Sequence, residues 1–209
     1  MMSERLQKIR KVAARRQLDL TVVLENVHDP HNISAVIRTC DAVGVAEIYV
    51  LYTDPRLQEL DFSIGKKSSG GSGRWVQIHR FLNHSECFET VRSRYQSVVG
   101  TSLIPPSTDL YSVDLNESVA IVFGNEHDGL SQATLQVLDQ SMSIPQVGMV
   151  QSLNISVACA VTLYEAFRQR WSVGKYDYSP RSSGSTSPDR EALLERYLRL
   201  QQEKKHFNP

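Results

Sequence analysis

The sequence has few cysteines and no long hydrophobic run, and each absence excludes a class of protein. Its three cysteines, Cys40, Cys87 and Cys159, are far apart and form no CxxC pair, so neither a disulfide framework nor a zinc site is expected. No apolar run approaches the roughly 20 residues that a helix needs to cross a bilayer. The basic segment 1–17 lacks the apolar core of a secretory signal. These features predict a cytoplasmic protein with no membrane partner and no metal.

Positive charge is missing from the middle of the chain, although the 209 residues carry no net charge overall. No lysine or arginine occurs between Tyr95 and Phe167, where seven acidic residues lie. Residues 1–94 carry a net charge of +3, and residues 168–209 carry +4. Because phosphate contacts dominate nucleic-acid affinity, basic ends can bind RNA even on a neutral chain. The alternative is that charge is simply absent from a buried middle region.

Short apolar runs alternate with helical patterns between residues 20 and 172. This order predicts an α/β fold, with a mostly parallel sheet and helices on both of its faces. We expect a basic N-terminal helix within residues 1–18, the α/β domain over 19–173, and a linker with a C-terminal helix over 174–209. The expected strands cover residues 21–27, 47–53, 75–81, 97–103, 118–124 and 141–145, and the expected helices follow Asn32, His84, Leu130, Ser152 and Ser187.

Polar residues follow the first expected strand and lead into an apolar helix in the segment DPHNISAVIRTCDAVG. Open α/β sheets bind ligands beyond the carboxyl ends of their strands. Arg38 lies on this apolar helix, six residues after Asn32, and a guanidinium in such a setting needs an anionic partner or solvent. The partner is either a ligand or an acid, such as Glu126 or the Asp41 of a neighbouring chain.

Two later strands also end in residues that suit a ligand. Gly124, in IVFGNEHDGLS, lets the backbone approach a bound molecule closely, although a tight turn between strand and helix would also need it. Ser152 and Asn154, in QSLNISVACAV, directly precede a long apolar helix. They either cap the free N–H groups of that helix, bind a ligand, or do both.

The spacing of glycine and histidine residues argues against several common ligand-binding and metal-binding motifs. The chain has no GxGxxG after its first strand, which disfavours a dinucleotide-binding Rossmann domain, and GKKSSGGSGRW lacks the GxxxxGK(S/T) order of a nucleotide triphosphate loop. We interpret that segment as a basic loop that closes on an RNA backbone through Lys66 and Lys67. His28 and His31 lack further ligands and are interpreted as loop histidines rather than a metal site.

Taken in order, NISAVIRTCDAVG, IVFGNEHDGLS and IPQVGMVQSLNISVACAV resemble the motifs of the SPOUT-class RNA 2′-O-methyltransferases. Within that class they are most similar to the TrmH-type tRNA (guanosine-18) enzymes, and the resemblance covers roughly residues 20–172. It implies a deep C-terminal trefoil knot, S-adenosylmethionine (SAM) bound in the knot, and a homodimer. The implied activity is methylation of a ribose 2′-hydroxyl of tRNA, at guanosine 18 of the D-loop.

The resemblance also implies roles for individual residues. The implied catalytic residues are Asn32, Arg38, Glu126, Ser152 and Asn154, and the implied cofactor contacts come from the loops at Thr101, Gly124, Ile144 and Leu153. Arg38 is expected to grip the phosphate beside the target ribose, since its guanidinium stays protonated and cannot act as a simple base. Glu126, Ser152 and Asn154 are expected to fix Arg38 and the knot loop.

The charge pattern adds an expected RNA surface, with exposed Lys8, Lys11, Arg15 and Arg16 on the first helix. Two alternatives stay open. One is an enzyme of the same class that methylates ribosomal RNA or the tRNA wobble ribose. The other is a non-catalytic RNA-binding dimeric scaffold, which would not need the five polar residues. The SSGGSG expansion departs from the family pattern, and it leaves the choice of RNA open.

Overall fold

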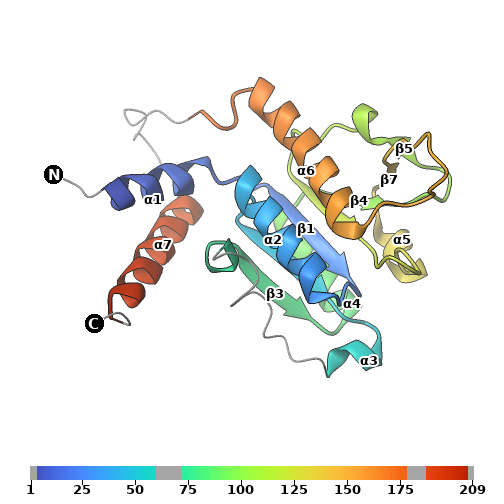
Figure 1. Cartoon of the computed structure of the whole chain (residues 1–209), viewed down its shortest axis with the longest axis horizontal. Coiled ribbons are helices and arrows are strands. Elements are labelled where there is room, and N and C mark those ends of the chain that lie inside the picture. The colour runs from blue at the N-terminus through green and yellow to red at the C-terminus, as the bar shows by residue number, and fades with distance from the viewer. Residues whose placement is uncertain (1–3, 60–71, 178–186, 207–209) are drawn as a thin grey trace.

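Seven strands form one sheet through the middle of the molecule (Figure 1). The computed structural model describes residues 4–59, 72–177 and 187–206; Lys66 and Lys67 therefore lie outside the described residues. The strands are β1 (Leu20–Glu25), β2 (Glu47–Leu51), β3 (Gln77–Phe81), β4 (Ser97–Thr101), β5 (Thr108–Asp109), β6 (Val119–Phe123) and β7 (Gln140–Ser143). They lie in the order β3-β2-β1-β6-β4-β7-β5, and every pairing is parallel. The expected parallel sheet is confirmed.

Helices cover both faces of the sheet, as expected. On one face, α2 (Pro30–Val43) and α6 (Ile155–Ser172) lie side by side. On the other face lie α4 (His84–Arg94) and α5 (Gln132–Val137). Successive residues of β1 enter different apolar clusters, because strand side chains alternate between faces. Burial on both faces explains why β1, β2 and β6 are almost continuously apolar.

The first long helix of the sheet domain has clear start and stop signals. The Asp29 side chain accepts a hydrogen bond of 2.8 Å from the backbone N–H of His31, and Pro30 occupies the first turn of α2. Gly44 follows the helix with φ of 91°, a left-handed conformation that favours glycine. The end predicted at Gly44 is therefore confirmed.

Helices from both ends of the chain pack together at one end of the molecule (Figure 1). These are α1 (Glu4–Arg15) and α7 (Pro188–His206). Their apolar contact includes Ile9 and Leu193. Arg190 of α7 donates hydrogen bonds to the carbonyls of Ala13 (3.1 Å) and Ala14 (2.5 Å), and so caps the C-terminal end of α1.

One expectation for the first helix is wrong. Lys8 and Lys11 are exposed and Arg15 is half-buried, but Arg16 is only 1% exposed. Its guanidinium donates to the Tyr197 hydroxyl (2.8 Å) and to the carbonyl of Val45 (3.1 Å), and it forms an ion pair with Asp41. The chain turns towards the sheet directly after α1, which carries this side chain inward. Arg16 thus anchors α7 and cannot contact RNA.

The shortest elements were not expected from the sequence. These are α3 (Pro55–Gln58), η1 (Ser72–Arg74), β5 and η2 (Leu110–Ser112). Each is four residues or fewer, too short to show a hydrophobic period. Within the described part of the chain, no helix is both long enough and apolar enough to cross a membrane.

Candidate active site

A cavity of about 390 Å³ opens at the carboxyl-terminal edge of the sheet. Thr101, Gly124, Ile144 and Leu153 all line it, although they span more than 50 residues of the chain. They meet because Thr101 ends β4, Gly124 and Ile144 follow β6 and β7, and Leu153 precedes α6. The carboxyl ends of parallel strands share one edge of the sheet. The volume lies in the range of small-molecule sites. That the four residues bind a cofactor is still a prediction.

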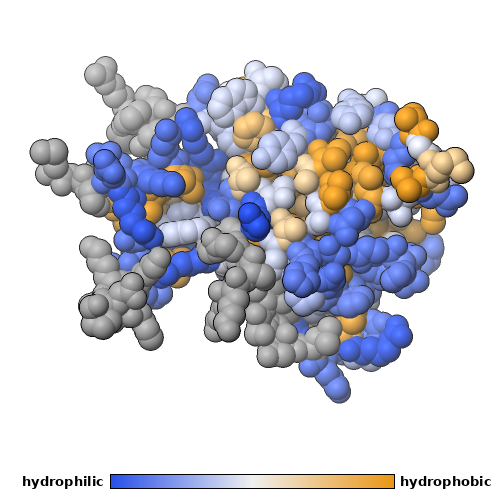
Figure 2. Space-filling model, in the orientation of Figure 1, coloured by the Kyte–Doolittle hydropathy of each residue, from blue (hydrophilic) through white to orange (hydrophobic). Residues whose placement is uncertain are grey.

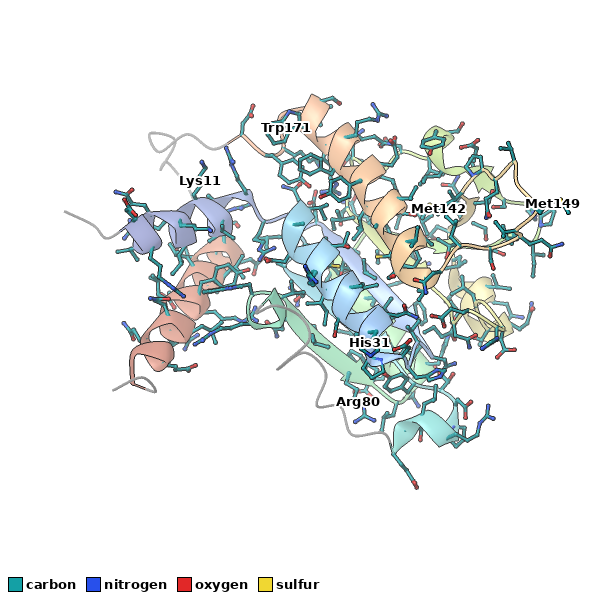
Figure 3. The ribbon with its side chains drawn as sticks, viewed as in Figure 1. Lys11, His31, Arg80, Met142, Met149 and Trp171 are labelled. Atoms are coloured by element: carbon teal, nitrogen blue, oxygen red, sulfur yellow. The ribbon has the colours of Figure 1, made fainter. Side chains whose placement is uncertain are left out.

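The cavity wall is largely apolar, with a polar side. Leu130, Leu135, Met142, Ile155 and Ala158 contribute carbon surface, which suits a flat aromatic base. Glu126, Asp128, Gln146 and Gln151 contribute polar groups. Leu103, Ile104, Val147 and Met149 are strongly exposed on loops at this end of the molecule, where Figure 2 shows apolar side chains and Figure 3 shows Met149 far from the sheet.

The loop after β6 folds back closely on itself. A Cβ atom on Gly124 would lie 2.1 Å from the backbone of Gly129, so no larger residue fits. The Asn125 side chain accepts hydrogen bonds from the N–H groups of His127 (2.9 Å) and Asp128 (2.7 Å), which closes the turn. The tight-turn interpretation of Gly124 is therefore correct, and the same turn holds Glu126 at the cavity.

A buried carboxylate that sequence reasoning missed fixes the far end of this loop. Glu25, fully buried at the end of β1, accepts hydrogen bonds from the Ser131 hydroxyl (2.6 Å), the Ser131 N–H (3.0 Å) and the Thr134 hydroxyl (2.9 Å). Ser131 is the N-cap of α5. Glu25 therefore joins the end of β1 to the start of α5. Its signal in the sequence, an acid ending an apolar strand, does not reveal partners about a hundred residues away.

Three of the expected catalytic residues meet, from the first turn of α2, the loop after β6 and the start of α6. The Asn32 side-chain amide donates to Glu126 Oε1 (2.5 Å), and that of Asn154 donates to Asn32 Oδ1 (3.1 Å). Asn154 Oδ1 also accepts from the backbone N–H of Ser156 (2.9 Å), which caps α6. The capping interpretation of Asn154 is therefore confirmed, and its binding of a ligand stays a prediction.

Arg38 is exposed on α2, and within residues 4–59, 72–177 and 187–206 no hydrogen bond or ion pair engages its guanidinium. Glu126, one of its expected partners, bonds to Asn32 instead. Ser152 is exposed and lines the cavity. A free guanidinium keeps a planar fork of donors, which matches the oxygen atoms of a phosphate.

Asn26 is a further residue that the sequence did not single out. It has φ of 54°, in the left-handed region that asparagine tolerates better than most residues. Its side-chain oxygen accepts from the N–H groups of Thr53 (2.9 Å) and Asp54 (3.2 Å). The loop after β1 is thereby joined to the loop after β2.

The two histidines of the first motif belong to no cluster of metal-ligating side chains among the described residues. His31 is exposed at the start of α2 (Figure 3), and His28 Nδ1 lies 3.4 Å from the carbonyl of Asn26. Among the described residues, no group of three or more histidine, cysteine, aspartate or glutamate side chains could hold a metal ion.

Comparison with known proteins agrees with this fold. A parallel α/β sheet with a loop-built cavity at its carboxyl edge defines a class of ligand-binding α/β proteins, and residues 19–164 match the SpoU rRNA methylase family. The chain is 43% identical over 173 residues to a tRNA (guanosine(18)-2′-O)-methyltransferase of Thermus thermophilus, covering 83% of this chain and 87% of that protein. The chain belongs to the SpoU methylase family.

Further relatives and solved structures extend the comparison. A tRNA (guanosine(18)-2′-O)-methyltransferase of Escherichia coli K12 is 39% identical over 82% of this chain and 73% of its own length. The crystal structure of the TrmH/SpoU tRNA modifying enzyme of A. aeolicus superposes with a TM-score of 0.80 at 34% identity, covering 96% of both chains. The AviRb methyltransferase of Streptomyces viridochromogenes, solved with AdoMet (SAM), has a TM-score of 0.66 at 31% identity, over 75% of this chain and 60% of its own.

Proposed function

We propose that this protein transfers a methyl group from SAM to the ribose 2′-hydroxyl of guanosine 18 in the D-loop of tRNA. The observation that carries the proposal is the network of Asn32, Glu126 and Asn154 at the edge of the cavity. Arg38 follows on the same helix with its donors free. The tRNA relatives from Thermus thermophilus and Escherichia coli support the choice of nucleotide.

The residues around the cavity fit SAM. Gly124 lets the loop after β6 fold closely onto Gly129 beside the cavity, and Thr101, Ile144 and Leu153 would present loop backbone groups to the adenine and ribose. When bound, SAM supplies a methyl group on a positively charged sulfur. The acidic side chains of Glu126 and Asp128 in the cavity lining suit that positive charge.

The protein's own part in the reaction is to place the ribose. Arg38 would hold the neighbouring phosphate through two parallel N–H bonds, which fixes the 2′-hydroxyl in line with the methyl group. The phosphate or a water molecule then takes the proton, because the Arg38 guanidinium keeps its own. Asn32 would contact the same backbone, while Glu126 and Asn154 hold its amide in position. Ser152, at the cavity lining, would complete the loop around the ribose.

The proposal includes the finer features that the resemblance implies. These are a deep trefoil knot in the segment that leads from β6 through β7 to α6, a homodimer, and action in the cytoplasm. We keep the division into a helix at residues 1–18, a methyltransferase domain at 19–173 and a linker with α7 at 174–209. Exposed Lys8 and Lys11, with half-buried Arg15, would contact tRNA phosphates, and Lys66 and Lys67 remain a prediction.

Ribosomal RNA is the alternative substrate, since the chain is also 36% identical to the 23S rRNA methyltransferase RlmB of Vibrio cholerae. That match covers only 63% of RlmB, whereas the match to the Thermus thermophilus tRNA enzyme covers 87% of the relative. The tRNA substrate is therefore better supported.

The test is to incubate the pure protein with SAM and bulk tRNA and rRNA, and to map ribose methylation. We expect one new methyl group at guanosine 18 of tRNA, and none with the Arg38→Ala variant. Methylation confined to rRNA, or to the wobble ribose of tRNA, would show that this nucleotide is the substrate and guanosine 18 is not. A titration that detects no binding of SAM would leave only the RNA-binding scaffold.

A further inference from the structure

A second cleft, of about 650 Å³, lies at the opposite edge of the sheet. It is formed where β2 and β3 begin, between the C-terminal end of α4 and one side of α7. β2 has five residues, so the two edges of the sheet are about 17 Å apart along a strand. Arg94, Arg196 and Arg199 line the cleft together with the acids Glu47 and Asp189. None of these residues has a role in the proposed methyl transfer.

Two of the three arginines keep their hydrogen-bond donors free. Arg196 and Arg199 are three residues apart on α7 and therefore lie on the same side of the helix. The Arg196 guanidinium lies over the ring of Tyr197, 5.9 Å from its centroid. In the part of the chain that the structure describes, neither arginine forms a hydrogen bond or an ion pair.

The acids of the cleft do not neutralise these two arginines. Glu47 accepts hydrogen bonds from the hydroxyls of Tyr49 and Tyr95, both at 2.9 Å, and pairs with His79 (3.0 Å) and Arg94 (3.2 Å). Its carboxylate is thus fully occupied. Asp189 is exposed at the start of α7, two turns before Arg196. Burial, together with the nearby charge of Arg16, lowers the pKa of Arg196.

The geometry points to a phosphate-binding site: we propose that Arg196 and Arg199 bind a phosphate group of the RNA backbone in this cleft. The inference rests on the proposed function, because that function supplies RNA. Two guanidinium groups on one helical side match the oxygen atoms of a phosphodiester. Exposed Lys8 and Lys11 lie on α1, which packs against α7 at the same end of the molecule. Both groups of charge lie at one end of the molecule and would attract the same RNA.

Two ligands carry the phosphate group that this cleft would bind: the RNA backbone and free phosphate. The first arm of the experiment measures the affinity of an unmodified tRNA transcript at several salt concentrations. The variants are Arg199→Gln and the double variant Arg196→Gln with Arg199→Gln. Gln202→Glu is the matched control, because it changes the charge of α7 by the same single unit at an exposed position outside the cleft.

Each lost phosphate contact removes about 0.7–0.9 from the slope of log affinity against log salt. At 0.15 M salt this corresponds to roughly fourfold to sixfold weaker binding for Arg199→Gln, and roughly 15- to 30-fold for the double variant. We expect the control to change affinity less than twofold. Equal affinity and slope for wild type, Arg199→Gln and the double variant would overturn the proposal, as would an equal loss in Gln202→Glu.

The second arm titrates the protein with inorganic phosphate against chloride at constant ionic strength, and follows the amide signals of α7 by NMR. Saturable shifts that vanish in the double variant, combined with unchanged tRNA affinity, would assign the cleft to free phosphate and overturn the RNA assignment. Failure of the proposed function is detected by a separate measurement, the methylation assay. With the wild type we expect methylation at guanosine 18, and with Arg199→Gln the same kcat and a higher KM. A wild type that binds tRNA without methylating it would refute the function but leave the salt-slope test valid.

Discussion

Near the amino-terminal edge of the parallel sheet the buried charged residues Arg16, Glu47 and Arg170 are all paired, whereas Arg38, on the helix that begins at the carboxyl-terminal edge, is exposed and keeps all its donors free. Arg170, on α6, is 0% exposed and donates to Asp19 (2.5 Å), Gln17 (3.1 Å) and the carbonyl of Leu115 (2.8 Å). Arg38, on α2, is exposed and forms no hydrogen bond or ion pair with any described residue. Both are arginines on helices of the same face of the sheet.

The difference separates residues that hold the fold from residues that act on a ligand. A buried guanidinium is tolerated only when its donors are bound, so such a residue has no capacity for a substrate. An exposed arginine without a partner contributes little to folding and keeps its donors for a ligand. Arg196 and Arg199 are the exception at the amino-terminal edge, and this is why a phosphate site is proposed there.

The largest expected effect is on catalysis. Arg38→Ala should lower the methylation rate about 10²–10⁴-fold, because positioning of the ribose and help with proton removal are both lost. The melting temperature and the affinity for SAM should stay near those of the wild type. Arg38→Lys should recover little of the rate, since lysine lacks the planar fork.

Arg56→Ala is the matched control for Arg38. Arg56 is another exposed arginine at the carboxyl-terminal edge, but its guanidinium is paired with Asp54 (2.6 Å). Its removal should change the single-turnover rate less than threefold, on the order of a surface ion pair. Equal losses in both variants would show that the effect comes from general positive charge and not from a specific contact of Arg38.

The next effect in size is on stability. Arg170→Ala should lower the free energy of unfolding by about 3–5 kcal/mol, because it leaves the buried carbonyls and Asp19 without their partner. Urea unfolding measures this directly. The fraction that stays folded should methylate at the wild-type rate. A stable Arg170→Ala protein with a slow reaction would contradict the distinction between the two edges.

Much of this arrangement could be predicted from the sequence, because hydrophobic period and punctuation are local signals. Residues 20–172 showed the alternation of strands and helices, and the end of α2 at Gly44 followed from a single glycine. Thr101, Gly124, Ile144 and Leu153 line one cavity because their loops share one edge of the sheet.

What could not be predicted depends on contacts between distant residues. Arg16 resembled its basic neighbours on α1 until the turn after the helix carried it inward to Asp41 and Tyr197. Glu25 and Glu47 are acids in apolar strands, and their partners include Ser131 and Tyr95, which lie far along the chain. The residues beside them in the sequence reveal neither their burial nor their hydrogen bonds.

Glu25→Gln should lower stability less than Arg170→Ala does. The substitution keeps the shape but removes charge-assisted hydrogen bonds to Ser131 and Thr134, so stability should fall by about 1.5–3 kcal/mol. The loop with Gly124 should loosen, which should weaken SAM binding in a calorimetric titration. Glu89→Gln, at an exposed position of α4, is the control and should change neither. Unchanged cofactor affinity in Glu25→Gln would refute the positioning role of Glu25.

The smallest effect concerns pH. Burial raises the pKa of Asp19, but the hydrogen bond from Lys175 and the charge of Arg170 outweigh it and leave the pKa below its ordinary value. Because the folded pKa is the lower one, the stabilisation is complete above the unfolded pKa of about 4 and is lost as pH falls through the folded pKa. Urea midpoints measured between pH 6 and pH 3 should fall less steeply for Asp19→Asn. Identical slopes would show that Asp19 is not linked to folding.

The central claim is that the site at the carboxyl-terminal edge methylates one ribose hydroxyl of tRNA. Removing the oxygen atom of that hydroxyl from the substrate tests the claim most directly. Two tRNA transcripts are prepared, identical except that one carries 2′-deoxyguanosine at position 18. With labelled SAM, we predict one methyl group per guanosine transcript and none in the deoxy transcript. Equal labelling of both transcripts would contradict the account.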